Sequence, residues 1–151
     1  MNAKHFFDKY WDGRMPVDIV ALAKAAGVIV RPNPQLKASG QFFFDEEQPI
    51  IEYNPSEHNV RQRFTIAHEL GHFVLEHGPA FRDSVENFNL STWNPKEIAA
   101  NRFAAEILMP EDAVEYLIHK EKEYSPNEMA LAFEVSPVAM RYRLKNLGWL
   151  P

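Results

Sequence analysis

The stretch FTIAHELGHFVLEH, residues 64–77, constrains the fold more than any other part of the sequence. An Asn-Pro-Ser turn precedes it and a Gly-Pro pair follows it, which predicts one long helix from about Glu57 to Glu76. Side chains four positions apart lie on one face of a helix, about 6 Å apart at Cβ. The imidazoles of His68 and His72 can therefore converge on one zinc ion.

Glu69 follows His68 directly and points about a third of a turn away from the histidine pair. It can therefore miss the ion and reach a water molecule bound to it, which is what a general base requires. The chain has no cysteine, so any metal must be held by His, Asp or Glu. The alternative is a chance coincidence of these residues on an exposed helix. An apolar helix face favours the zinc site, and four residues supply it: Val60, Phe64, Ala67 and Val74.

Two histidines leave a catalytic zinc site one protein ligand short. The segment NPKEIAANRFAAEILMP, residues 94–110, predicts a second long helix with Asn94 as its N-cap. Its Glu97 is the candidate ligand, although a capping-box glutamate at this position turns back to the helix N-terminus. Asn101 favours the ligand role, because an amide one turn further on could hydrogen-bond a ligating histidine. Glu106, off the face shared by these two residues, is the alternative ligand.

The remaining segments predict an α+β fold, in which a small three-stranded sheet packs against a mainly helical domain. A helix is predicted within residues 17–27, a strand at 28–32, and two strands joined by a polar turn within 40–54. The irregular pattern at 79–93 predicts a loop. Two Ser-Pro pairs predict two short helices joined by a tight turn within 125–148.

Length and composition predict one domain spanning residues 1–151, with 124–151 as its C-terminal helical segment. No stretch approaches the roughly 20 apolar residues of a membrane span, and the N-terminus lacks the apolar run of a signal peptide. We therefore expect a cytoplasmic protein that does not bind membranes. The net charge of −5 gives no global attraction to nucleic acid.

Taken together, RFTIAHELGH and the later EIAANRFAAEILMP resemble the ImmA/IrrE family of zinc metallopeptidases. The similarity extends to DIVALAKAAGV, IIEYN and SPVAMRYRLKNLGWL, so it covers nearly the whole chain. The resemblance implies His68, His72 and Glu97 as zinc ligands and Glu69 as the catalytic glutamate. It also implies a zinc-dependent endopeptidase of bacterial or phage origin, whose substrate is a helix-turn-helix repressor or antitoxin.

For peptide hydrolysis, Glu69 would take a proton from the attacking water and deliver it to the leaving amine. Tyr53, His77 and His58 lie close in sequence to the motif and are candidates for binding the oxyanion or the substrate, or else are ordinary surface residues. The strand PIIEYN, 49–54, could offer an edge to an extended substrate, or be an ordinary core strand.

A second hypothesis is a binding or regulatory module that acts through its C-terminal helices without proteolysis. These helices have helix-turn-helix proportions and carry Arg141, Arg143 and Lys145 on the second helix. Against direct DNA binding, the turn contains Glu134 and no glycine, and the chain is acidic. The intact Glu69 favours the enzyme, since a structural metal site needs no general base.

Overall fold

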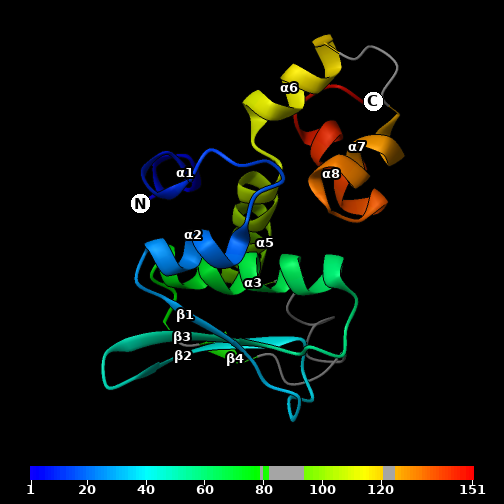
Figure 1. The fold of residues 1–151 in the computed structure, drawn as a ribbon. Helices are drawn as coiled ribbons and strands as arrows, with labels where there is room; N and C mark the ends of the chain where they lie inside the picture. Colours follow the sequence, from blue (N-terminus) through cyan, green and yellow to red (C-terminus); the bar gives the residue numbers. More distant parts are fainter. Residues whose placement is uncertain (79, 82–93, 121–124) are drawn as a thin grey trace.

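The computed structural model describes residues 1–78, 80–81, 94–120 and 125–151, and Figure 1 shows how its elements are arranged. In chain order they are α1 (Ala3–Tyr10), α2 (Ile19–Ala25), β1 (Ile29–Pro32), β2 (Gly40–Asp45), β3 (Gln48–Tyr53), α3 (Asn59–Val74), β4 (Ala80–Phe81), α5 (Pro95–Leu108), α6 (Glu111–Lys120), α7 (Pro126–Phe133) and α8 (Pro137–Asn146). The predicted α+β class is confirmed.

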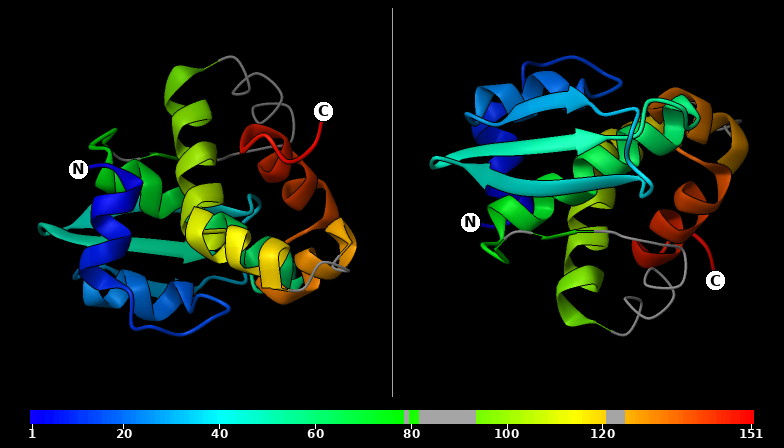
Figure 2. Two further views of the ribbon diagram at one scale, coloured as in Figure 1. Left: turned by 90° about the horizontal axis from the view of Figure 1, so that it is seen from above. Right: turned by 90° about the horizontal axis from the view of Figure 1, so that it is seen from below.

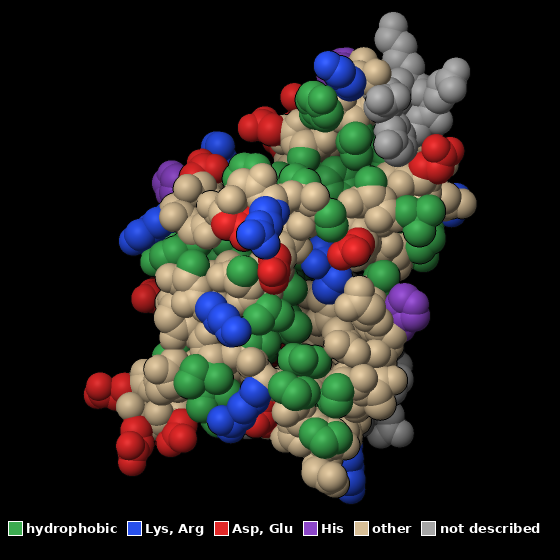
Figure 3. All heavy atoms as spheres, viewed as in Figure 1, with side chains coloured by type: hydrophobic (Ala, Val, Ile, Leu, Met, Phe, Trp, Pro, Cys, Tyr) green, Lys and Arg blue, Asp and Glu red, His purple; other side chains and the backbone are tan. Residues whose placement is uncertain are grey.

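The described strands form one mixed sheet in the order β1-β3-β2-β4. β3 pairs in parallel with β1 and antiparallel with β2, and the acidic turn between β2 and β3 forms the tip at the lower left of Figure 3. The three predicted strands are present, but the prediction missed β4, which pairs with β2. β4 falls within the predicted loop at 79–93, whose other residues lie outside the described chain. The suggestion that β3 is a free edge is wrong, because strands flank it on both sides.

Helix α3 lies between the sheet and helix α5 (Figure 1), with α2 beside α3 and over β1 (Figure 2), and most residues of α3 are buried. Two glycines allow its neighbours to approach closely. A Cβ at Gly40 on β2 would overlap the Thr65 side chain and lie 2.9 Å from the carbonyl oxygen of Glu52. A Cβ at Gly71 on α3 would lie 3.1 Å from a ring carbon of Phe103 on α5. Both faces of the motif-bearing helix are thus held at short range.

Side-chain caps begin the helices as the sequence predicts. Asn94 accepts a hydrogen bond from the backbone N–H of Lys96, and Ser125 and Ser136 cap α7 and α8 in the same manner. Helices α1 and α6 were not predicted. Both are short amphipathic helices that contribute little to the core, since α1 buries only two of its side chains and α6 only one.

The C-terminal helices share one continuous buried core with the rest of the described chain. Arg63 on α3 fastens them to it, since its guanidinium donates hydrogen bonds to the carbonyl oxygens of Val17, Phe133 and Glu134. Burial lowers the pKa of Arg63, while the carboxylates of Glu134 and Asp18 raise it. Among the helices described, none combines the length and apolar character needed to cross a bilayer.

Candidate metal centre

Four polar side chains are buried where α3 packs against α5. His68, Glu69 and His72 come from α3 and Glu97 from α5, and each is at most 6% exposed. Burying polar and charged groups is unfavourable unless they have partners. Contacts among these four groups must therefore offset the cost of burying them.

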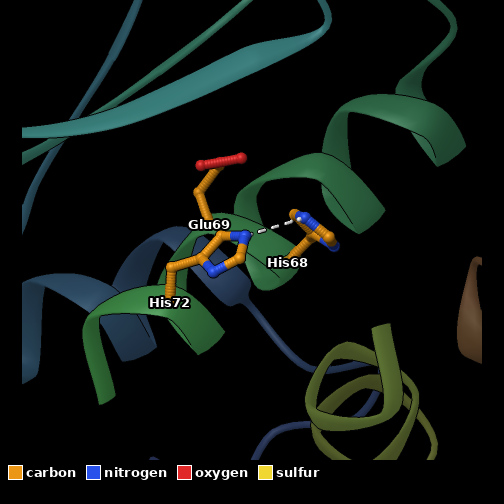
Figure 4. A group of neighbouring side chains, drawn as sticks. All are labelled: His68, Glu69 and His72. Carbon is orange, nitrogen blue, oxygen red and sulfur yellow. Dashed lines mark hydrogen bonds between the residues drawn. The ribbon is translucent and has the colours of Figure 1, made fainter. Parts of the chain in front are cut away.

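The two imidazoles and the Glu97 carboxylate converge on one point. His68 Nε2 lies 3.1 Å from Glu97 Oε2, and His72 Nε2 lies 3.0 Å from Glu97 Oε1. The two Nε2 atoms are 3.2 Å apart, and Figure 4 shows the rings turned toward each other. Ligands at about 2.0–2.1 Å around a tetrahedral zinc ion are separated by about 3.3 Å. The spacing of these three groups, here called the cluster, therefore fits one shared ion.

The contacts of the Nδ1 atoms bear on the tautomers of the two histidines. His68 Nδ1 lies 2.7 Å from Asn101 Oδ1, which can only accept, so this nitrogen donates and leaves the lone pair on Nε2. His72 Nδ1 lies 2.9 Å from His77 Nδ1, and either of these two nitrogens can be the donor. With the proton of each ring on Nδ1, both Nε2 lone pairs would face the Glu97 carboxylate, the arrangement in which the three groups can share a metal cation.

The surroundings of the Glu97 carboxylate keep it ionised. Burial raises the pKa of Glu97, but hydrogen bonds and charge from His68 and His72 lower it more strongly, so that it lies far below its ordinary value. The carboxylate is therefore ionised at neutral pH. Glu97 does not turn back to the helix N-terminus, and the capping-box alternative is wrong for its side chain.

Glu69 lies beside the cluster rather than within it. The Glu69 carboxylate points toward the strands in Figure 4. One of its oxygens lies within 4.8 Å of a ring nitrogen of His68 and of a ring nitrogen of His72. A Cβ added to Gly40 would lie 3.7 Å from Glu69 Cγ, so β2 passes directly over this side chain. Glu69 can reach a molecule held between the cluster and the sheet.

The other candidates from the sequence are scattered. Glu106, the alternative ligand, lines a separate cleft between α1 and α6, near Arg143. His58 caps the N-terminus of α3, where its Nδ1 accepts from the backbone N–H of Val60. Tyr53 packs against the hydrophobic core, and no hydrogen bond within the described chain joins it to His68 or His72.

The contact between His77 and His72 was missed by sequence reasoning. His77 follows the end of α3, and its backbone N–H donates to the carbonyl oxygen of His72, which folds the chain back onto that ring. Burial and the nearby Lys96 lower the pKa of His77. The five-residue spacing carries no helical signal once the helix has ended, so only the folded chain brings these rings together.

Comparisons with known proteins agree with this geometry. The chain belongs to the family Peptidase_M78, described as the IrrE N-terminal-like domain, whose sequence profile matches residues 23–145. It is a metallopeptidase family, and membership together with the buried His-Glu-x-x-His group indicates a metal ion. The resemblance to the ImmA/IrrE family is confirmed.

The chain is also similar to two individual proteins. It is 34% identical over 117 residues to the radiation response metalloprotease IrrE of Deinococcus radiodurans, a match that covers 72% of this chain and 34% of that protein. A solved Mycobacterium tuberculosis transcriptional regulator shares its fold, with a TM-score of 0.64 and 16% identity over 95% of this chain and 44% of that one. The chain thus spans less than half the length of either protein.

Proposed function

We propose that the protein is a zinc-dependent endopeptidase, with His68, His72 and Glu97 as zinc ligands. The observation that supports this most is the meeting of two imidazole Nε2 atoms and an ionised carboxylate at 3.0–3.2 Å in a buried position. Nitrogen and oxygen donors without thiolates suit a catalytic zinc site, in which a fourth position stays open.

Zinc bound there would supply a Lewis acid that acidifies water and polarises a peptide carbonyl. In this proposal Glu69 accepts the proton of the attacking water and returns it to the leaving amine. Asn101 and His77 hold the rings of His68 and His72 in the orientation that directs each Nε2 at the ion. Because the His77 ring already contacts His72, we assign it this positioning role in preference to an oxyanion contact.

The proposed substrate is a cytoplasmic helix-turn-helix repressor or antitoxin. This part of the proposal rests on the resemblance to the ImmA/IrrE family, and not on any surface of the chain. A protein substrate is consistent with the metallopeptidase family to which the chain belongs.

Elemental analysis of purified variants tests the ligand set. We expect about one zinc ion per chain in the wild type and in Glu69→Gln, and none in His72→Ala or Glu97→Ala. Glu106→Ala is the matched control, since it removes another carboxylate from α5 and should keep the metal. Asn101→Ala should weaken zinc binding by about 10- to 100-fold.

The same preparations test catalysis. The zinc-loaded wild type is mixed with the helix-turn-helix regulator encoded nearest its gene, and the products are identified by mass spectrometry. We expect cleavage at one or a few bonds by the wild type and none by Glu69→Gln. Stoichiometric zinc in Glu97→Ala would contradict the ligand assignment, and cleavage by Glu69→Gln would contradict the role of Glu69. An intact regulator would exclude it as the substrate and favour a role by binding alone.

A further inference from the structure

A concave surface lies beside the cluster, between α3, α5 and α8. It has a volume of about 620 Å³, and in Figure 2 helices α5 and α8 lie on the same side of α3. This groove, as it is called below, takes apolar lining from all three helices, principally Val60, Phe64, Ile98, Ala105, Val138 and Tyr142. Val60 and Phe64, which the sequence placed on an apolar helix face, both line the groove, and Phe64 also packs against the core.

Three of the apolar lining residues are unusually exposed. Ile98 is 44% exposed, Val138 77% and Tyr142 63%. Single exposed apolar residues are common, but a group that lines one concavity marks a binding surface. A volume near 600 Å³ lies within the range of clefts that enclose a few side chains of a ligand.

The charge of the groove is opposite to that of the whole chain. Its described lining contains the guanidinium groups of Arg61 and Arg102 and no carboxylate, in a protein of net charge −5. Arg102 is exposed and forms no ion pair with any residue that the structure describes. Through Arg102 the groove therefore attracts carboxylates, whereas the net charge of the molecule repels them.

Asn101 joins the groove to the cluster. Its side chain lines the groove, while its Oδ1 accepts the hydrogen bond from His68 Nδ1 at 2.7 Å. The Asn101 amide and the His68 ring thus connect the groove to the point where the ligand atoms converge. A polypeptide lying in the groove would therefore pass close to the proposed catalytic zinc.

We propose that the groove binds a segment of the protein substrate in which large apolar side chains are flanked by aspartate or glutamate. Binding there would place a neighbouring peptide bond at the cluster, so this proposal rests on the proposed function. The apolar lining disfavours a nucleic acid backbone as the occupant. Of the three basic residues on α8, Arg143 donates a hydrogen bond to the carbonyl oxygen of Met109. Its guanidinium is thus engaged within the protein, which also argues against a nucleic acid occupant.

Selection from a displayed library of random dodecapeptides tests this proposal. The target is the full chain with Glu69→Gln, so that bound peptides are not cut. We expect enriched sequences that combine Leu, Phe or Ile with neighbouring Asp or Glu. A synthetic copy of the commonest one is then labelled and its affinity measured by fluorescence anisotropy.

Two pairs of variants locate the binding surface. In the same Glu69→Gln chain, Arg102→Glu and Val138→Ser should each weaken peptide binding on the order of tenfold. Lys24→Glu makes the same charge change on α2, and Leu131→Ser the same polarity change at a residue of α7 that is 79% exposed, both outside the groove. We expect neither control to alter the affinity.

Several results would overturn the proposal. These are the absence of enriched peptides, enrichment of Lys- or Arg-rich sequences, or equal affinity in all four variants. Duplex DNA binding that Arg102→Glu abolishes would assign the groove to nucleic acid, and a dimer that Val138→Ser dissociates would assign it to a second copy. Peptide binding needs neither zinc nor hydrolysis, so its failure is separable from failure of the endopeptidase proposal, which zinc content and cleavage report.

Discussion

The helix pair α3–α5 and the helix pair α7–α8 depart from ordinary burial in opposite directions. The first pair buries ionisable side chains, with Glu69 and His72 each 1% exposed. The second pair exposes apolar side chains, with Leu131 79% and Val138 77% exposed. Each departure has a cost to stability or solubility. In the proposals above, this small chain separates chemistry from recognition: buried ionisable groups on α3 and α5 serve the reaction, and exposed apolar groups such as Val138 serve substrate binding.

Two arginines connect these two regions, Arg63 buried and Arg143 partly buried. Arg63 on α3 donates to three carbonyl oxygens, two of them at the end of α7, whereas Arg143 on α8 donates to the carbonyl oxygen of Met109. Removing a buried donor leaves its acceptors without hydrogen bonds, at a cost of about 1–3 kcal/mol for each. Substituting these two arginines should therefore weaken the attachment of α7–α8 to α3–α5 by different amounts.

The largest expected effect is that of Arg63→Met. We expect it to lower the free energy of unfolding by about 3 kcal/mol or more, because three carbonyl groups lose their donor while the apolar volume is kept. Urea unfolding measures this change. Arg143→Met, which deprives one carbonyl, should cost about 1–2 kcal/mol. Equal losses in the two variants would show that the number of carbonyl contacts does not set the coupling between the regions.

Zinc binding should stabilise the two helix pairs to different extents. At about 100 times its dissociation constant, a ligand that binds only the folded state adds about 2.7 kcal/mol of stability. Since the proposed ligands lie on α3 and α5, we expect zinc to slow amide hydrogen exchange mainly in these helices and less in α7 and α8. Glu97→Ala should show no response. Equal protection of all four helices would mean that the two regions open together.

The smallest expected effect concerns Glu52 on β3, outside both helix pairs. Burial raises its pKa, but hydrogen bonds from Asn33, Arg31 and Gln41 and the charge of Arg31 lower it more, so the net shift is downward. Its stabilising contribution is therefore fully present above the unfolded-state pKa, near 4.3, and is lost as the pH falls through the folded-state pKa.

Unfolding of Glu52→Gln across a pH series checks this. We expect the stability difference from wild type to be constant near neutral pH and to shrink below about pH 4.5. Glu47→Gln, in the exposed turn between β2 and β3, should show no such trend. A difference that grew on acidification would mean that the net shift of the pKa is upward.

Much of the fold follows from local signals. The predicted long helix begins two residues later and ends two residues earlier than expected, and α5, α7 and α8 begin at their predicted caps. The interior position of β3 was not predictable, because strand order depends on pairing between distant segments. The groove was not predictable either, since it takes its lining from three helices far apart in the sequence.

Glu97 and Glu128 mark the limit of what the sequence determines. Each stands three residues after an N-cap and two after a proline, so local rules predict the same capping role for both. Glu128 remains at its cap, where Ser125 Oγ donates to its carboxylate at 3.2 Å. Glu97 instead meets His68 and His72 at 3.0–3.1 Å.

The sequence by itself placed the two histidines on one helix face, because a four-residue spacing is a local property. The tertiary structure alone decided that α5 brings a carboxylate to them, since Gly71 allows Phe103 to approach α3 closely.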